Sequence, residues 1–290
     1  MASSEATLNI ERLLPEDAED VCHLSVEAGW NQVAADWRLM LGSGVAFGIK
    51  EPSGTWIASA LTLPHGPTIA WISMVLVTRP QRGKGLGTRL LRRCMAEAKR
   101  TGRAMGLDAT EFGRPIYLPL GFRDVYPLSR WSAQQPVRTM VAAPEGVIIR
   151  ATGSGDLARI ASYDRARSGL DRQMVLDNLL ARAPQVAHVA ESGDGSLVGY
   201  ALGRDGYAAM HIGPVVAEDQ AIGRALVSRA LARIEGPVIM DVPDQQAAVR
   251  EVLGSQGFRP VRTFMRMVRG AAPEVEEGSC IMALAGPELA

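Results

Sequence analysis

Apolar and polar residues follow one another with two different periods, and their order along the chain predicts a mixed α/β fold. Residues 45–50, 55–63 and 68–77 are short apolar runs separated by the turn sequences Glu-Pro-Ser-Gly and Pro-His-Gly-Pro, so they are predicted to be strands. The third run is almost wholly apolar, as expected for a strand buried on both faces. Residues 85–101 carry apolar side chains about every four positions, which predicts an amphipathic helix.

The other elements of the first half follow from the same reasoning. Residues 15–29 begin with Pro and acidic residues and have helical periodicity, and a second short helix is expected at 34–41. After the amphipathic helix come a predicted strand at 104–109, a short helix at 114–120 and a strand from Gly121 onward.

A similar order of elements recurs in the second half of the chain. The expected elements are a strand at 147–151, helices at 155–166 and 172–183, strands at 185–190, 197–202 and 208–213, a helix at 222–234, a strand at 237–242, a helix at 247–256 and a strand at 257–268. Gly87 precedes Phe122 by 122 − 87 = 35 residues, and Gly223 precedes Phe258 by 258 − 223 = 35. Each glycine opens a helix and each phenylalanine lies in a Gly-Phe-Arg triplet, which indicates a duplicated unit.

The boundary between the two units is predicted where the periodicity is lost. Residues 132–146 lose their repeat and gain Pro, Gly and Ala. We therefore expect a first domain at 1–135, a linker at 136–146 and a second domain at 147–290, lengths that suit two globular domains.

Composition and charge exclude several classes of protein. Lys plus Arg equals Asp plus Glu at 31 each, so the overall charge gives no attraction to nucleic acid. No apolar run reaches the roughly 20 residues of a membrane span, and the start of the chain has no secretory pattern. The three cysteines are scattered and the four histidines are dispersed, so neither a disulfide framework nor a metal site is expected. These features favour a cytoplasmic protein. The sequence leaves both a monomer and a homodimer as alternatives.

The segment Pro80-Gln-Arg-Gly-Lys-Gly-Leu-Gly-Thr88 joins the buried strand to the amphipathic helix and predicts a phosphate site. Glycines let a ligand approach the main chain closely, and the amides at a helix N-terminus are unpaired and favour negative charge. Arg82 and Lys84 add positive charge, so a pyrophosphate suits this junction. The spacing fits neither the P-loop GxxxxGK nor the dinucleotide fingerprint GxGxxG. An irregular helix cap is the alternative that needs no ligand.

Residues 81–87 resemble the Q/R-x-x-G-x-G/A signature of the GCN5-related N-acetyltransferases (GNAT). The stretch Pro115-Ile-Tyr-Leu-Pro-Leu-Gly-Phe122 resembles the second signature of that family, in which a tyrosine precedes a Gly-Phe pair. The rest of the chain resembles bacterial members with two such folds in tandem. The resemblance therefore implies an α/β class with a mixed sheet in each of two GNAT-like folds, the second of them degenerate.

The resemblance also implies how acetyl-CoA would bind as co-substrate. Main-chain groups of the buried strand would bind the pantetheine, and the glycine loop would wrap the pyrophosphate with backbone amides. The residues implied are Val75, Leu76 and Val77 for the first contact, and Arg82, Gly83, Lys84, Gly85, Leu86, Gly87 and Thr88 for the second.

The same resemblance makes Tyr117 the candidate general acid for the departing thiolate, with a tyrosine that only packs on its helix as the alternative. No base is evident, because 68–77 contains no carboxylate or histidine. Asp108 and Glu111 lie near the expected cleft and His65 lies in a turn, although surface or capping roles suit all three better than base catalysis. A water relay or an acceptor that enters as the free amine needs no base.

Residues 29–37, Gly-Trp-Asn-Gln-Val-Ala-Ala-Asp-Trp, lie in the segment that usually covers the acceptor site in this family. Trp30, Asn31 and Asp36, with Asp108 and Glu111, are the candidate substrate residues, and Asp36 is equally suited to cap the helix that follows it.

The second half is an internal control for the phosphate site. Alignment of Gly87 with Gly223 places Ala217-Glu-Asp-Gln-Ala221 opposite the glycine loop, so two carboxylates stand where a pyrophosphate would bind. Leu253 stands opposite Tyr117. We therefore expect the second fold to keep the scaffold, to bind no CoA, and to shape the acceptor site or an interface.

The leading hypothesis is an acetyl-CoA-dependent N-acetyltransferase that acts on a primary amine. A small-molecule amine is the favoured acceptor. A sensor or interaction module that binds acetyl-CoA without turnover is the first alternative, and a nucleotide-binding protein is the second. The sequence does not choose between amino acid, polyamine, antibiotic and protein lysine as acceptor.

Overall fold

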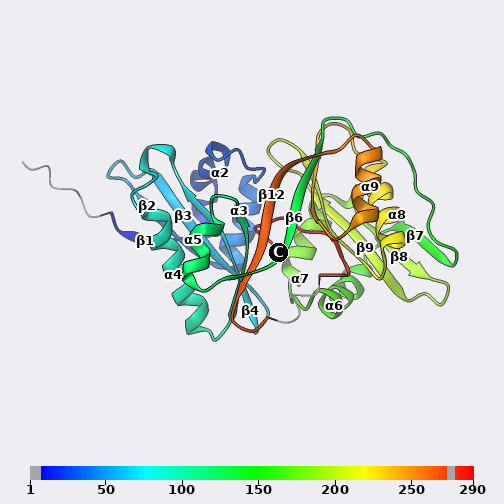
Figure 1. The fold of residues 1–290 in the computed structure, drawn as a ribbon, viewed down its shortest axis with the longest axis horizontal. Coiled ribbons are helices and arrows are strands. Elements are labelled where there is room, and N and C mark those ends of the chain that lie inside the picture. The colour runs from blue at the N-terminus through cyan, green and yellow to red at the C-terminus, as the bar shows by residue number, and fades with distance from the viewer. Residues whose placement is uncertain (1–7, 273–277) are drawn as a thin grey trace, which may run out of the picture.

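The computed structural model describes residues 8–272 and 278–290, and its first half contains the predicted α/β elements (Figure 1). They are β1 (Ile10–Leu13), η1 (Pro15–Asp17), α1 (Ala18–Val21), α2 (His23–Glu27), α3 (Ala34–Ser43), β2 (Val45–Lys50), β3 (Trp56–His65), β4 (Ile69–Val77), η2 (Arg79–Gln81), α4 (Leu86–Arg100), β5 (Ala104–Thr110), α5 (Arg114–Tyr117), η3 (Leu118–Leu120) and β6 (Arg123–Ala133).

The second half repeats this order. Its elements are β7 (Val147–Ala151), α6 (Asp156–Ser168), α7 (Gln173–Arg182), η4 (Pro184–Val186), β8 (His188–Ser192), β9 (Leu197–Arg204), β10 (Met210–Ala217), α8 (Gln220–Leu231), β11 (Val238–Pro243), α9 (Ala247–Ser255), β12 (Arg259–Arg269) and β13 (Ile281–Ala283). The hydrophobic pattern does not predict β1 or β13, because four and three residues are too few to display a period.

All the strands belong to one mixed sheet that runs through both halves. Its order is β1-β2-β3-β4-β5-β12-β6-β11-β10-β9-β8-β7, and β13 pairs with β10. Only β4 with β5 and β10 with β11 are parallel among the strand pairs of the described residues. These two parallel pairs occupy equivalent places in the two halves, as a duplicated unit requires.

The final strands of the two halves are exchanged. β12 lies between β5 and β6, and β6 in turn pairs with β11 of the second half. Figure 1 shows β12, in orange, beside the N-terminal strands, with β6, in green, toward the other half. Residues 136–144, inside the proposed linker, contain no helix or strand. The division at 1–135, 136–146 and 147–290 stays a prediction along the sequence, while in space each half is completed by a strand of the other.

Helices cover both faces of the sheet. On one face α4 packs on β2, β3 and β4, and α8 packs on β8, β9 and β10. On the other face α1, α2 and α3 pack against the first half and α6 and α7 against β9, around buried residues such as Trp37, Trp71 and Tyr200. The alternation of β9 explains this separation, because Ala201 packs toward α8 whereas Tyr200 and Leu202 pack toward α6 and α7.

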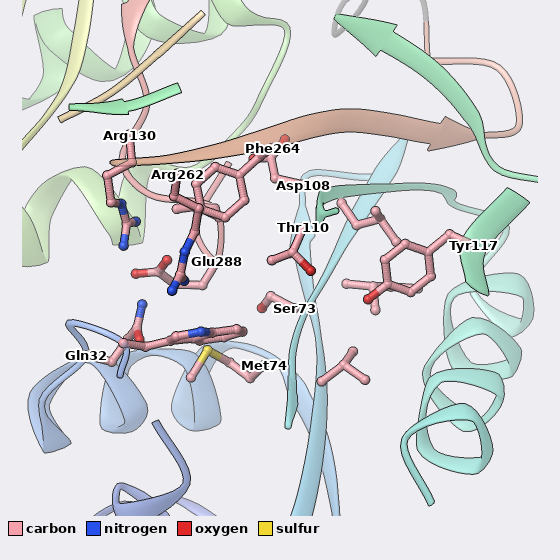
Figure 2. Close-up of a pocket in the computed structure, with 15 residues that line it drawn as sticks. Gln32, Ser73, Met74, Asp108, Thr110, Tyr117, Arg130, Arg262, Phe264 and Glu288 are labelled. Atoms are coloured by element: carbon pink, nitrogen blue, oxygen red, sulfur yellow. The ribbon is translucent and has the colours of Figure 1, made fainter. Parts of the chain in front are cut away.

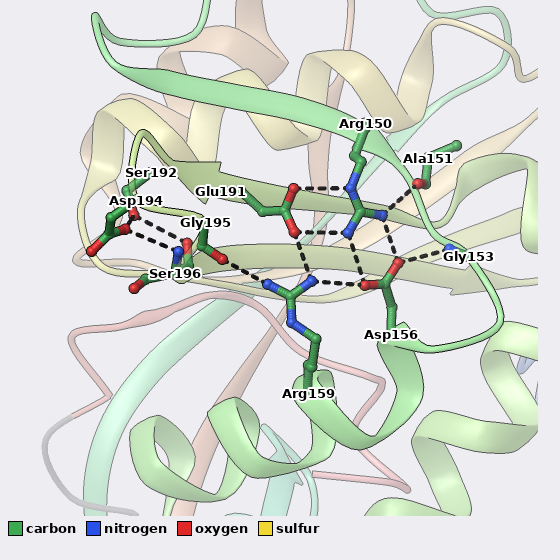
Figure 3. Close-up of polar contacts among 10 residues, drawn as sticks. All are labelled: Arg150, Ala151, Gly153, Asp156, Arg159, Glu191, Ser192, Asp194, Gly195 and Ser196. Atoms are coloured by element: carbon green, nitrogen blue, oxygen red, sulfur yellow. Dashed lines mark hydrogen bonds and ion pairs between the residues drawn. The ribbon is translucent and has the colours of Figure 1, made fainter.

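Charged side chains fasten the outer edge of the second half (Figure 3). Arg150 on β7 forms ion pairs with Asp156 at 2.6 Å and with Glu191 on β8 at 2.7 Å, and Arg159 on α6 also contacts both carboxylates. The hydrogen bond from Arg150 lowers the pKa of Asp156 to about 2. This cluster therefore joins β7, β8 and the start of α6.

A buried ion cluster joins the two halves. The carboxylate of Asp36 is completely buried and lies 2.6 Å from Arg182 and 2.8 Å from Arg204, both in the second half. Its other oxygen accepts a hydrogen bond from the Val33 amide at 2.8 Å, which caps α3. Arg204 also contacts Glu288 in the C-terminal segment.

Replacing Asp36 with Asn is expected to lower the free energy of unfolding by about 3 kcal/mol, because it removes the buried carboxylate that Arg182 and Arg204 share and leaves Arg182 only the exposed Asp205. Denaturant titration followed by tryptophan fluorescence measures the loss. The matched control is Glu19→Gln, which breaks the exposed pair with Arg38 and should cost less than about 1 kcal/mol. Equal losses in the two variants would show that the Asp36 cluster contributes no more than a surface pair.

Candidate active site

The two parallel strands of the first half separate and leave a main-chain edge open. β4 pairs with β5 only through Ile69–Trp71 and Ala104–Gly106, after which β5 continues beside β12. In the described part of the chain, no strand pairs with residues 72–77 of β4 on that side. Apart from the Val77 carbonyl, which accepts a hydrogen bond from Arg82, the amides and carbonyls on this edge are therefore free to bind an extended ligand.

An irregularity in β4 changes its direction at this opening. The pairing with β3 shifts between Ser73 and Leu76, so β4 bulges, and Met74 has a φ of 51°. The hydroxyl of Ser59 donates a hydrogen bond of 2.8 Å to the Met74 carbonyl and holds the bulge. After it, Val75 and Val77 pack with the cluster under α4, and Leu76 packs into the opposite core.

The glycine loop lies at the end of this open edge. Gly83 and Gly85 have φ values of 79° and 75°, and no heavy atom lies within 4 Å of the point where a Cβ would be on either. The amides of residues 83–88 donate to no backbone acceptor among the described residues. Arg82 is held by a hydrogen bond of 3.1 Å to the Val77 carbonyl. The start of α4 thus presents consecutive free amides in open space, the arrangement that suits a phosphate.

A pocket opens beside the bulge and encloses about 620 Å³ of empty space, including its part open to solvent. It is lined by Trp30, Gln32, Ile72, Ser73, Met74, Val75, Leu107, Asp108, Thr110, Tyr117, Arg130, Arg262, Phe264, Pro287 and Glu288. Figure 2 shows Tyr117 at one end and Arg130, Arg262, Glu288 and Gln32 gathered at the other.

Tyr117 extends from α5 toward the pocket. Its ring packs on Phe122 with centroids 6.0 Å apart, and Gly113 provides the space for the ring, because a Cβ there would lie 2.9 Å from it. Burial raises the pKa of Tyr117 to about 12. No described protein atom forms a hydrogen bond with its hydroxyl, so the phenolic proton remains in place and available to a ligand.

The predicted substrate residues are not brought together. Trp30 and Asp108 line the pocket, but the carboxylate of Asp108 forms two hydrogen bonds of 2.9 Å with Arg266. Asn31 instead binds the main chain of Ala208 and Ala209.

Three further expectations need correction. Asp36 caps α3 and pairs with two arginines, so its carboxylate is not available to a substrate ammonium, and the capping alternative holds. Glu111 is exposed beside α5 and does not line the pocket. His65 is buried at the end of β3, away from the pocket, and burial lowers its pKa to about 3.

Several pocket residues were missed because they come from distant segments. Arg262 and Phe264 reach the site through the exchanged β12, and Arg130 through β6. Pro287 and Glu288 arrive on the C-terminal segment, whose Pro287 carbonyl accepts a hydrogen bond of 2.9 Å from Trp71. One pattern in the sequence does point to this segment. Ile281–Ala285 is entirely apolar, which favours burial against the core, and these residues are buried in the structure.

In the second half the equivalent opening is filled by the chain itself. β10 and β11 pair only at two positions, and β13 then lies against β10 in the opening, with the Leu284 amide donating 2.8 Å to the Asp241 carbonyl. Met282 covers the start of α8, where a Cβ on Gly223 would lie 2.6 Å from it. At the N-terminus of α8 the carboxylate of Asp219 accepts from the Ile222 amide at 2.8 Å and takes the place of an external anion.

Two kinds of site have no counterpart in residues 8–272 and 278–290. No helix there is long and apolar enough to cross a membrane, and no three side chains of His, Cys, Asp or Glu gather as metal ligands would.

Comparison with known proteins agrees with this geometry. The model of the acetyltransferase (GNAT) family matches residues 12–116, and that of an acetyltransferase (GNAT) domain matches residues 160–281. The chain belongs to the GNAT superfamily, with two domains in tandem. This GNAT protein is therefore an acyltransferase.

Relatives of this tandem GNAT protein span nearly all of it. It is 26% identical over 250 residues to the uncharacterized N-acetyltransferase YitH of Bacillus subtilis, covering 85% of this chain and 86% of YitH. A GCN5-related N-acetyltransferase from Sphaerobacter thermophilus has a TM-score of 0.63 at 18% identity, over 90% of this chain and 95% of that one. A tandem GNAT protein from the clavulanic acid biosynthesis pathway has a TM-score of 0.62 at 16% identity, over 92% and 99%. At these identities the two structures establish the fold alone.

Tyr117 is expected to stay protonated above pH 10, because burial disfavours the phenolate. Its folded-state pKa of about 12 lies above the unfolded value, so its contribution to stability is complete below about pH 10 and is lost as the pH rises toward 12. NMR of the ¹³Cζ resonances of labelled tyrosine, assigned with Tyr117→Phe, measures the titration. An ionisation of Tyr117 at or below pH 10 would contradict the burial argument.

Proposed function

We propose that this acyltransferase moves the acetyl group of acetyl-CoA to a primary amine of a small molecule. One observation carries the proposal: the open edge of β4 leads from the pocket at Ser73–Val75 toward the loop whose amides at residues 83–88 are free. An extended thioester that ends in a pyrophosphate is a ligand of that shape and charge. The pocket at the other end of the edge, lined by Trp30, Tyr117 and Phe264 among others, is where the acceptor would bind.

The residues of the chain would divide the binding as follows. Main-chain groups of Val75, Leu76 and Val77 pair with the pantetheine, as a further strand would pair with an open edge. Residues 82–88 receive the pyrophosphate on their amides, with the positive charge of Arg82 and Lys84 beside it. When bound, acetyl-CoA supplies an activated thioester.

Tyr117 acts as the general acid in this proposal. It gives its phenolic proton to the departing sulfur while the acceptor nitrogen bonds to the acetyl carbon and loses a proton to water. Asp108 is not free to take the proton of the acceptor nitrogen, because both oxygens of its carboxylate accept hydrogen bonds from Arg266. An acceptor that arrives as the neutral amine, or a relay of waters, fits this lining.

The second half binds no CoA in this proposal. Its opening contains β13, and its phosphate position contains the Asp219 carboxylate. Its role is to supply β12 and the C-terminal segment to the pocket of the first half. A sensor that binds acetyl-CoA without turnover has the same loop, and the free hydroxyl of Tyr117 at the pocket favours catalysis over it.

Replacing Gly85 with Glu is expected to abolish acetyl-CoA binding, because a carboxylate would stand at the free amides and a side chain would be strained at a φ of 75°. Calorimetric titration with acetyl-CoA measures it. The matched variant is Asp219→Lys at the start of α8, which removes a cap and should leave CoA affinity unchanged. Loss of affinity in Asp219→Lys alone would move the cofactor site to the second half. Titration with ATP and NAD tests the alternative of a nucleotide-binding protein. A nucleotide that competes with acetyl-CoA for the protein would support that alternative.

Replacing Tyr117 with Phe is expected to lower kcat by about 100-fold or more while acetyl-CoA affinity changes little, because only the proton donor is removed. Release of free CoA with a panel of amines measures the rate. The control is Tyr207→Phe, since Tyr207 is an exposed tyrosine of the second half. An unchanged kcat would exclude Tyr117 as the acid. CoA binding without turnover of any amine would favour the sensor.

A further inference from the structure

The charges that line the pocket are paired, with one exception. Three of its ionised side chains have a partner within 3 Å: Asp108 with Arg266, Arg130 with Asp241, and Glu288 with Arg204. Arg262 also lines the pocket, and no described residue forms a hydrogen bond or an ion pair with it. Arg262 is exposed to solvent, and because an arginine stays charged in proteins, this end of the pocket carries a positive charge that no carboxylate contacts directly.

The pairing of β12 with β6 determines where this charge lies. Arg262 stands opposite Arg130 on β6, in a register that continues unbroken to Arg266 and shifts only on the other side of Arg262, toward Pro260. Phe264, two residues further along the strand, also lines the pocket, so the alternation of β12 puts Arg262 and Phe264 on the same face. The side chain of Val261 is exposed.

Two arginines stand opposite each other at this end of the pocket, and a bound anion would reduce their repulsion. Like charges directly opposite on neighbouring strands repel each other. Arg130 is satisfied by Asp241 on β11 through two hydrogen bonds of 2.8 Å, and those bonds use both carboxylate oxygens. Burial and the charge of Arg130 lower the pKa of the Arg262 guanidinium, and the nearby Asp241 carboxylate offsets only part of that effect.

The position of Arg262 tells which ligand group would meet it. Figure 2 shows Arg262 at the end of the pocket away from Tyr117, near Gln32 and Glu288. The side-chain oxygen of Gln32 is buried without a hydrogen-bond partner, and only the Oε1 atom of Glu288 accepts from Arg204. A ligand that fills this end would find a donor at Arg262 and free acceptors beside it.

We propose that Arg262 binds an anionic group, a carboxylate or a phosphate, carried by the acceptor amine. The acceptor class is thus an amine with its own anion, such as an amino acid, and not a polyamine or a neutral alkylamine. This inference rests on the proposed function and deepens it, since it concerns the substrate of the same pocket. Arg262 is then a specificity-determining residue that places the amine toward β4 and Tyr117.

The experiment compares matched acceptors on the full chain. Three series of equal chain length serve as probes: ω-amino carboxylates, ω-aminoalkyl phosphonates and alkylamines. Amino acids and the amines formed by their decarboxylation make a second set of pairs. Acetyl transfer is followed by release of CoA, and binding of the same probes in the presence of CoA is followed by calorimetry. Preference within the anionic series distinguishes a carboxylate from a phosphate acceptor.

The wild-type protein should prefer an anionic acceptor to its neutral partner by at least about tenfold in kcat/KM, the value of one charge-assisted hydrogen bond. Arg262→Gln should remove that preference, mainly through KM, and Arg262→Lys should restore part of it. The control is Arg259→Gln on the same strand, an exposed arginine that does not line the pocket, and it should keep the wild-type preference. A variant that has lost its fold would be seen by its circular dichroism, and Arg262→Lys then gives the answer.

Each failure has its own signature. Equal transfer to anionic and neutral amines, or a preference that persists in Arg262→Gln, overturns the anion site and leaves the N-acetyltransferase proposal standing. If no amine of any series is acetylated, the proposed function fails, and the binding measurements then decide about Arg262. Absence of a tighter complex with the anionic probes in wild type than in Arg262→Gln overturns the inference in that case as well.

Discussion

The separation of two parallel strands is the constraint on which the rest of this structure depends. β4 and β5 share a hydrogen-bonded ladder over three residues only, because β5 continues beside β12 while β4 bulges at Met74. On the side toward β5, the main chain of residues 72–77 is left without a partner strand among the described residues. Unpaired main-chain groups near a core are costly, so such an edge persists where a ligand or another segment satisfies it.

The two halves satisfy the same constraint in different ways. In the second half the opening between β10 and β11 is closed by β13, and the anion position at α8 is taken by Asp219. In the first half both positions are open. The duplicated fold has thus kept one opening for an external molecule and closed the other with its own chain.

Closing the second opening has a consequence for the first. β13 is held against β10, and the segment that follows it enters the first half, where Trp71 binds the Pro287 carbonyl and Glu288 lines the pocket. The exchanged β12 contributes Arg262 and Phe264 to the same pocket. The second half is therefore part of the acceptor site even though its own opening is filled.

Local sequence determined the elements and the phosphate loop. Strand and helix periods, turn residues and the repeated 35-residue spacing of Gly87–Phe122 and Gly223–Phe258 give the order of elements and the duplication. Gly83 and Gly85 with Arg82 and Lys84 identify the loop, because backbone freedom and charge are properties of adjacent residues. For the same reason, the sequence alone shows that Asp219 stands in the second copy where the first has Gly83.

Only the tertiary structure decided which side chains meet in the pocket. Asp36 and Asn31 looked like substrate residues from their neighbours in sequence, yet their partners are Arg182, Arg204 and the main chain of Ala208 and Ala209, all in the other half. Arg262 and Glu288 enter through an exchanged strand and a short buried segment. Contacts of this kind join residues more than a hundred positions apart, and no local period or spacing encodes them, because they are selected by burial and charge once the sheet has formed.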